Sequence, residues 1–277
     1  MKSKKHKKIH SFITIILLVL IALFTYEIVA GESKEVKEAK SFMIRLERMY
    51  AINLTEPIKE MKFEVINPNG NIDATVGYTV ATKNYGIDLD KEYRVVGFSK
   101  KEAKHGNKVN ITEEEAINIA KKFSTELTDE SLEYKGMKTV EGQDLPYYNV
   151  AFSKTKGDYS YLDKEVVVQI DKYTGELDGY SNVYLDDFEH ISTKKISEEQ
   201  AIEGIKTYLN KLGYTLTEQK LKQIGYVTIA EKKNVLAYLF DIKYVDKDGE
   251  NHDYTIQVST FSGDIVNGIK EVRKSSK

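Results

Sequence analysis

The sequence contains no cysteine and no tryptophan, and only 3 prolines and 5 histidines among its 277 residues. Without cysteine the chain can form no disulfide or zinc-thiolate site, and a cysteine nucleophile or a lipid-carrying cysteine is also excluded. The hydrophobic share of 41% and the charged share of 30% are typical of a globular protein. The formal net charge is −2, and the part after residue 30 is mildly acidic, which argues against a nucleic-acid partner.

No known catalytic motif is present in the sequence. HExxH, GxSxG, phosphate-binding P-loop and GxGxxG patterns are all missing. The acidic neighbours of His190, which are Asp186, Asp187 and Glu189, suggest either a metal site or a solvated linker. The linker is favoured because no second ligand cluster has metal-binding spacing. We therefore expect no catalytic, cofactor-binding or metal site, and a protein that is not an enzyme.

The N-terminus combines a lysine cluster with a long apolar stretch. Lys2–Lys8 is basic, and Ile9–Ala30 is mainly apolar, with Glu27 near its end. About 20 apolar residues span a bilayer, and preceding lysines keep an N-terminus in the cytoplasm. Residues 1–30 therefore predict a cytoplasmic tail and a single-pass signal anchor, with residues 31–277 extracytoplasmic. The alternative is a signal peptide cleaved near Ala30, which would give a secreted protein.

Two separated segments recur later in the chain in the same order. ITEEEAI at Ile111–Ile117 returns as ISEEQAI at Ile196–Ile202. QIDKYTGEL at Gln169–Leu177 returns as QVSTFSGDI at Gln257–Ile265. The two offsets are nearly equal, so the chain contains a duplicated structural unit.

Each copy opens with a predicted helix. Thr112 and Ser197 are candidate N-caps, and Glu115 and Gln200 stand three residues later, which is the capping-box pattern. The apolar residues that follow recur at helical spacing in both copies. The acidic residues of the first turn are therefore expected to serve the cap and the helix dipole.

After each helix the apolar pattern changes to a period of two, which indicates strands. The alternating residues are Tyr148, Val150 and Phe152 in the first copy and Tyr238, Phe240 and Ile242 in the second. Gly175 and Gly263 each supply a turn before the last strand. We predict an α+β protein in which an N-terminal transmembrane helix precedes tandem units of one helix packed on a three- to four-stranded antiparallel sheet.

A third, degenerate copy is predicted before the other two. LDKEYRVVGFS at Leu89–Ser99 resembles IDKYTGELDGYS at Ile170–Ser181, and a juxtamembrane helix is expected at about Ser33–Tyr50. The predicted domains are residues 31–107, 108–193 and 194–277. The apolar stripe of the juxtamembrane helix fits packing on its own sheet, which we favour, or a coiled coil between two anchored chains. That stripe consists of Val36, Ala39, Met43, Leu46 and Tyr50.

The two repeated segments resemble those of the PepSY domain. Its helix-opening and glycine-turn patterns match Thr112–Ile117 with Ile170–Leu177, and Ser197–Ile202 with Val258–Ile265. The arrangement is similar to the tandem PepSY-like repeats of the YpeB and YcdB/YcdC-like groups of Gram-positive bacteria. This resemblance implies a binding or regulatory protein that inhibits or chaperones an envelope or secreted hydrolase, either a protease or a cell-wall hydrolase. The alternative is a structural cell-envelope or sporulation-associated ectodomain without inhibitory activity.

Tyrosines offer the best candidates for a partner-binding surface. The chain has 19 tyrosines, and Tyr147, Tyr148, Tyr159 and Tyr161 are placed on both faces of a strand or in a loop. Tyrosine combines an apolar ring with a polar hydroxyl and is enriched at interfaces. The open edge of an antiparallel sheet is a second route, because it can add an extended segment of a partner protein.

Overall fold

The computed structural model describes residues 32–66, 75–101, 108–139, 142–186, 188–230 and 232–269. These residues form three α-helices, a short 3-10 helix and mainly antiparallel strands, so the predicted α+β class is confirmed. The predicted membrane anchor lies outside the described residues. Within them, no helix is both long enough and apolar enough to cross a bilayer.

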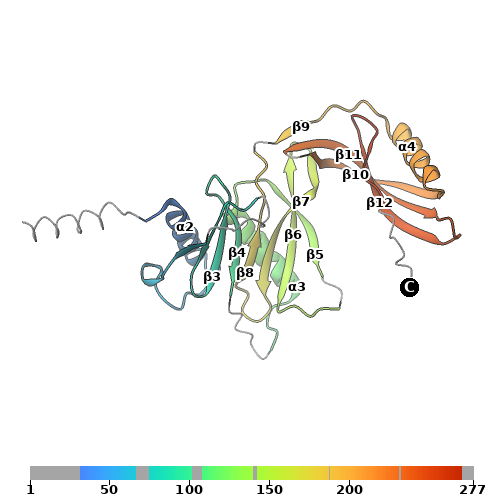
Figure 1. Cartoon of the computed structure of the whole chain (residues 1–277). Coiled ribbons are helices and arrows are strands. Elements are labelled where there is room, and N and C mark those ends of the chain that lie inside the picture. Colours follow the sequence, from blue (N-terminus) through green and yellow to red (C-terminus); the bar gives the residue numbers. More distant parts are fainter. Residues whose placement is uncertain are drawn as a thin grey trace, which may run out of the picture. The chain divides into compact units, whose positions relative to one another are not determined.

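The chain divides into two compact units, Met1–Val95 and Val96–Lys277, and each is described by itself. Figure 1 labels most of their helices and strands, numbered in chain order. The domain boundaries predicted after residues 107 and 193 stay predictions.

The first unit packs one helix on a small antiparallel sheet. Helix α2 (Lys34–Arg48) is followed by the 3-10 helix η1 (Ile58–Glu60) and by the strands β1 (Glu64–Ile66), β2 (Tyr78–Ala81) and β3 (Tyr85–Leu89). Strand β2 pairs with both β1 and β3. Helix α2 begins at its N-cap Ser33, whose hydroxyl accepts a hydrogen bond from the Val36 amide.

The apolar stripe of α2 packs within its own unit, which confirms the favoured interpretation. Ala39, Met43 and Leu46 are fully buried, and α2 contacts β1 and β2. Tyr50 departs from the stripe, because it lies after the helix with φ 56° and an exposed fraction of 86%. The helix had already ended at Arg48, so helical spacing no longer governs the direction of the Tyr50 side chain.

The second unit begins with a five-stranded antiparallel arrangement. Its elements are β4 (Val95–Lys100), α3 (Glu113–Leu127), β5 (Leu132–Lys138), β6 (Tyr147–Lys156), β7 (Tyr159–Asp171) and β8 (Leu177–Ser181). The strand order is β5-β6-β7-β8-β4. Helix α3 packs on β6 and β7 through a buried face formed by Ala116, Ala120, Phe123 and Leu127.

The later part of this unit repeats the same order of elements. It comprises β9 (Glu189–Ile191), α4 (Glu198–Lys211), β10 (Thr215–Ala230), β11 (Lys233–Val245), β12 (Asn251–Ser259) and β13 (Ile265–Asn267). Strands β10 to β13 form an antiparallel meander. Figure 1 shows α4, in orange, beside these strands. Their shared core contains Ile205 and Leu209 from the helix with Phe240 and Ile256 from the sheet.

The second unit contains two parallel pairings, which the antiparallel prediction missed, and the first of them joins its two halves. Strand β7 runs parallel to β10 where Ser160 and Tyr161 face Gly225 and Tyr226. Strand β9 runs parallel to the start of β11. A Cβ atom at Gly225 would lie 2.4 Å from the Ser160 carbonyl oxygen, so glycine allows the close approach of the two strands.

Candidate functional site

The first repeated segment fixes the start of α3 to the turn after β7. The amides of Asn110 and Ile111 both donate to the carbonyl of Lys172 at 3.1 Å. The Tyr148 hydroxyl donates to the Ile111 carbonyl at 2.9 Å. These three hydrogen bonds join a helix, a strand and a turn that lie far apart in the sequence.

The predicted capping box is present at the start of α3. The Thr112 hydroxyl accepts from the Glu115 amide, and the Glu115 carboxylate accepts from the Thr112 amide at 2.8 Å. The Thr112 amide and then its hydroxyl hold the pKa of Glu115 below its usual range, since both donate to the ionised carboxylate. The equivalent box in α4 is formed by Ser197 and Gln200. The repeated acidic segment therefore caps helices.

We call the three hydrogen bonds around Ile111 the lock of the first half. An equivalent lock is present at the start of α4 in the second half. The amides of Lys195 and Ile196 donate to the Thr260 carbonyl at 2.8 and 2.9 Å. The Tyr238 hydroxyl donates to the Ile196 carbonyl at 2.9 Å. Tyr148 and Tyr238 thus have the same structural role in the two halves.

The repeated glycine turns also match. In the first, the Asp171 carboxylate accepts from the amides of Tyr173 and Thr174, and in the second the Ser259 hydroxyl accepts from the two corresponding amides. The φ values of Gly175 and Gly263 are 75° and 79°, in a backbone region that residues with a side chain rarely adopt. What the sequence repeats is therefore a scaffold.

The four predicted partner-binding tyrosines do not form one surface. Tyr161 is buried, with an exposed fraction of 4%, whereas Tyr147, Tyr148 and Tyr159 are half-buried. The hydroxyl of Tyr148 is used in the lock described above. Tyr159 packs edge-on against Tyr226 and has the Lys194 ammonium over its ring. Their role in binding a partner stays a prediction.

His190 lies at the junction of the two halves, in contact with several strands. Its Nε2 atom is 2.5 Å from the Tyr161 hydroxyl on β7, and its Nδ1 atom is 3.1 Å from the Lys156 ammonium at the end of β6. Its ring also packs edge-on against Tyr226 of β10. Across the described ranges, no group of three metal-ligating side chains surrounds this or any other position.

Two titratable groups of this junction are perturbed. Burial, followed by the charge of Lys156, lowers the pKa of His190. Burial is also the main reason why the pKa of Tyr161 is raised to about 12. The Nε2 atom of His190 also lies 3.3 Å from the Asn234 Nδ2 atom on β11. The neutral imidazole therefore joins β6 and β7 to the strands of the later half.

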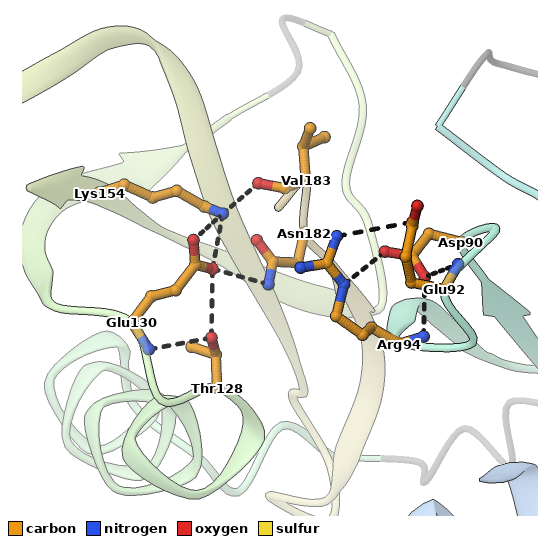
Figure 2. Close-up of polar contacts among 8 residues, drawn as sticks. All are labelled: Asp90, Glu92, Arg94, Thr128, Glu130, Lys154, Asn182 and Val183. Carbon is orange, nitrogen blue, oxygen red and sulfur yellow. Dashed lines mark hydrogen bonds and ion pairs between the residues drawn. The ribbon is translucent and has the colours of Figure 1, made fainter. Parts of the chain in front are cut away.

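A buried ion pair lies next to this junction. Lys154 has an exposed fraction of 1%, and its ammonium is 2.6 and 2.7 Å from the two carboxylate oxygens of Glu130. The ammonium also donates to the Val183 carbonyl, and the carboxylate accepts from Asn182 and Thr128 (Figure 2). These contacts tie the end of α3 to β6 and to the segment after β8.

The sequence interpretation did not single out this ion pair, although a signal was present. Val150 and Phe152 alternate inward on β6, and the same period places Lys154 inward as well. A lysine at a core position requires an acidic partner, because a buried charge is stable only when paired. The partner, Glu130, could not be predicted, since it reaches β6 from the loop after α3.

The first unit contains a turn that is stabilised by an ion pair and hydrogen bonds, also drawn in Figure 2. The Asp90 carboxylate accepts from the amides of Glu92 and Arg94 at 3.0 and 2.8 Å, and from Arg94 Nε at 2.7 Å. Each contact connects residues within four positions of one another, so this cluster stabilises the turn that follows β3.

Two of the hollows on the described surface of the second unit are the larger candidates for binding. A groove of about 230 Å³ runs between α3 and β5 and is lined in part by Leu132, Tyr134 and Phe152. A broader hollow of about 560 Å³ lies on β10, β11 and β12. Acidic and basic side chains line it, and two of them, Glu218 and Lys243, form an ion pair. The groove is thus the more apolar of the two.

The described residues form an α+β scaffold in which helix caps and glycine turns are repeated. Comparison with known proteins identifies one domain of this scaffold. Residues 110–177 match the family described as "Peptidase propeptide and YPEB domain", or PepSY. The chain therefore contains a PepSY domain, which confirms the family resemblance for the first of the two copies. No curated protein matches the chain.

Among solved structures, the fold is similar to that of the Bacillus megaterium YpeB C-terminal domain. The TM-score is 0.52 at 18% sequence identity, and the match covers 86% of this chain and 96% of that chain. At this identity the likeness concerns the fold alone.

Proposed function

We propose that this chain is a non-catalytic PepSY protein that binds and regulates a secreted or envelope hydrolase. The observation that carries the proposal is the PepSY match over residues 110–177, a family whose description names peptidase propeptides. The proposed target is a separate protein, on which the chain acts in trans.

The two halves of the second unit support a tandem PepSY-like arrangement. The Tyr148 and Tyr238 hydrogen bonds, the two capping boxes and the two glycine turns occupy equivalent positions. The later half, residues 194–277, is accordingly proposed as a second unit of the same kind. Binding is assigned to parts in which the two halves differ, because the shared residues serve the scaffold.

Capture of partner proteins tests the regulatory role. The full-length chain, immobilised in detergent micelles, is exposed to the secreted and envelope proteins of its source organism. We expect a hydrolase to be retained and its activity to fall as the chain is added. Sedimentation of the chain with peptidoglycan, without any captured hydrolase, would instead support a structural envelope role.

The proposal also places residues 31–277 outside the cell membrane, behind the lysine-flanked apolar segment. The absence of cysteine makes this directly testable, because a single introduced cysteine is then the only thiol. A membrane-impermeant maleimide added to intact cells should label Lys247→Cys and leave Ser3→Cys unlabelled. The opposite labelling pattern would contradict the proposed orientation.

A further inference from the structure

Strand β5 offers an open edge beside helix α3. Among the described residues, β5 pairs only with β6. The Ser131 carbonyl accepts from the Thr155 amide of β6 at 3.0 Å. Because successive residues of an antiparallel strand alternate in direction, the backbone groups of Leu132 and Tyr134 turn away from β6, towards the open edge.

The side chains of these two residues face the groove of about 230 Å³ between α3 and β5. Leu132, Tyr134 and Phe152 provide its apolar surface, and Tyr134 retains an exposed fraction of 38%. One strand edge therefore presents outward backbone groups and an apolar hollow at the same two positions. This combination suits an extended polypeptide, whose backbone pairs with the edge while one side chain enters the hollow.

The charges around the edge favour an acidic occupant. The acidic groups here already have internal donors: Lys154 for Glu130, the Ser160 hydroxyl for Glu133, and both Lys135 and Lys138 for Glu165. Lys121 lines the groove, lies 5.0 Å from the centre of the Tyr134 ring and makes no ion pair within the described part of the chain. A carboxylate of the occupant can therefore pair with Lys121 without displacing an internal partner.

A β-bulge limits how much of the edge can be used. The register of β5 on β6 shifts between Tyr134 and Gly136, which interrupts the ladder beside Lys135. Bulges and edge lysines are features that prevent indiscriminate strand addition. Pairing is thus restricted to the short stretch Leu132–Tyr134, and the occupant depends on its side chain in the groove for affinity.

We infer that this α3–β5 groove binds a short extended segment of a partner protein, in which an apolar side chain and an acidic side chain two positions away face the same side. The inference rests on the proposed function, and it specifies the segment by which the regulated hydrolase is held. The apolar side chain contacts Leu132 and Tyr134, and the carboxylate pairs with Lys121.

Synthetic peptides test this inference without the hydrolase. The probe is a short capped peptide of alternating threonine and valine with a central leucine and an aspartate two positions after it, so that both side chains face the groove. Matched peptides replace the leucine with serine or the aspartate with lysine. Binding to the full-length chain in micelles is measured by fluorescence anisotropy, and hydrogen exchange with mass spectrometry locates the protected amides.

The leucine–aspartate peptide should bind most tightly and should protect the amides of Leu132 and Tyr134. Lys121→Glu should weaken its binding about fivefold, as expected for loss of a surface ion pair, and should favour the lysine peptide. Lys122→Glu is the matched control on the exposed face of α3 and should have little effect. Thr125→Trp, which fills the groove, should weaken all three peptides.

Equal binding of the serine peptide, protection elsewhere, equal effects of the two lysine variants, or no binding at millimolar concentration would each overturn the inference. These outcomes leave the proposed function untouched, because hydrolase capture is measured independently. Conversely, if the chain binds the peptide but captures no hydrolase, the inference about the groove stands and the proposed function is wrong.

Discussion

At the scale of single residues, Lys154 is a buried charge that is held by several partners. Its exposed fraction is 1%, and it is held by the Glu130 carboxylate and the Val183 carbonyl. Lys154→Met should lower the free energy of unfolding by about 3–5 kcal/mol, because the Glu130 carboxylate is left without its cation. Chemical denaturation measures this loss. Lys164→Met, on a half-exposed lysine of β7, is the control, and equal effects of the two substitutions would contradict the account.

Tyr50 has a strained backbone at the end of α2. Its φ is 56°, and the amides of Tyr50 and Ala51 donate to the carbonyls of Glu47 and Leu46, which is the Schellman pattern that favours glycine at this position. Tyr50→Gly should raise the stability of the first unit by about 0.5–1 kcal/mol, since the clash of the Cβ atom is removed. Thermal unfolding checks this effect. Tyr50→Ala keeps the Cβ atom and should give no such gain, so an equal gain would refute the explanation.

His190 should make the stability of the second unit depend on pH. Its folded-state pKa is lowered from the ordinary value of 6.5, so protonation is more costly in the folded chain than in the unfolded chain. The stability that neutral His190 supports is therefore present above pH 6.5 and declines as the pH falls below that value. The acidic and basic groups near it include Lys156 and Tyr161, and the latter keeps its proton throughout this range.

The measurement is the melting temperature of the full-length chain at neutral and mildly acidic pH. His190→Asn should reduce the loss of stability on acidification, since asparagine does not titrate. His252→Asn is the matched control, because His252 is more exposed and pairs with Asp246 at the other end of β11. If His190→Asn loses as much stability on acidification as the unmodified chain, the assignment is wrong.

At the scale of elements, the helix caps should contribute equally in the two halves. Thr112→Ala and Ser197→Ala each remove the side-chain hydroxyl that accepts a hydrogen bond from the amide of the third helical residue. Each should cost about 1 kcal/mol of stability, measured by chemical denaturation. Thr125→Ala, on the exposed face of α3, is the control, and a cap substitution with no greater effect would contradict the assigned role.

The sequence predicted the elements well where the signal was local. The capping boxes at Thr112 and Ser197 and the turns at Gly175 and Gly263 depend on residues within four positions of one another, so their pattern is visible in the chain. The parallel pairing of β7 with β10 was missed, because its register is set by the close approach at Gly225 between distant segments.

The candidate sites were less predictable for the same reason. The predicted tyrosines were chosen from their neighbours in sequence, whereas Tyr161 is buried by His190 and Tyr226 from other strands. The groove depends on α3 lying beside β5, which no pattern in either segment reveals. The alternation of inward side chains along β6 did indicate a buried position for Lys154, but its partner Glu130 lies in a loop.

At the scale of the whole molecule, the scaffold is repeated in the two halves, and the proposed binding function lies in parts that differ between them. The lock around Tyr148 is repeated around Tyr238, whereas the groove beside β5 contains Lys121, and the corresponding position of α4 is Lys206, which pairs with Glu203. Substitutions in the lock are therefore expected to lower stability, and substitutions in the groove are expected to lower binding. The regulatory claim depends on this separation.

The most direct test is a titration of secreted and envelope hydrolase activities with the full-length chain in micelles. The account predicts a saturable loss of one hydrolase activity, weakened by Lys121→Glu and unchanged by Lys122→Glu, with both variants as stable as the original chain. Hydrolase activities that stay constant at every concentration of a folded chain would contradict the central claim that this PepSY protein is a regulator.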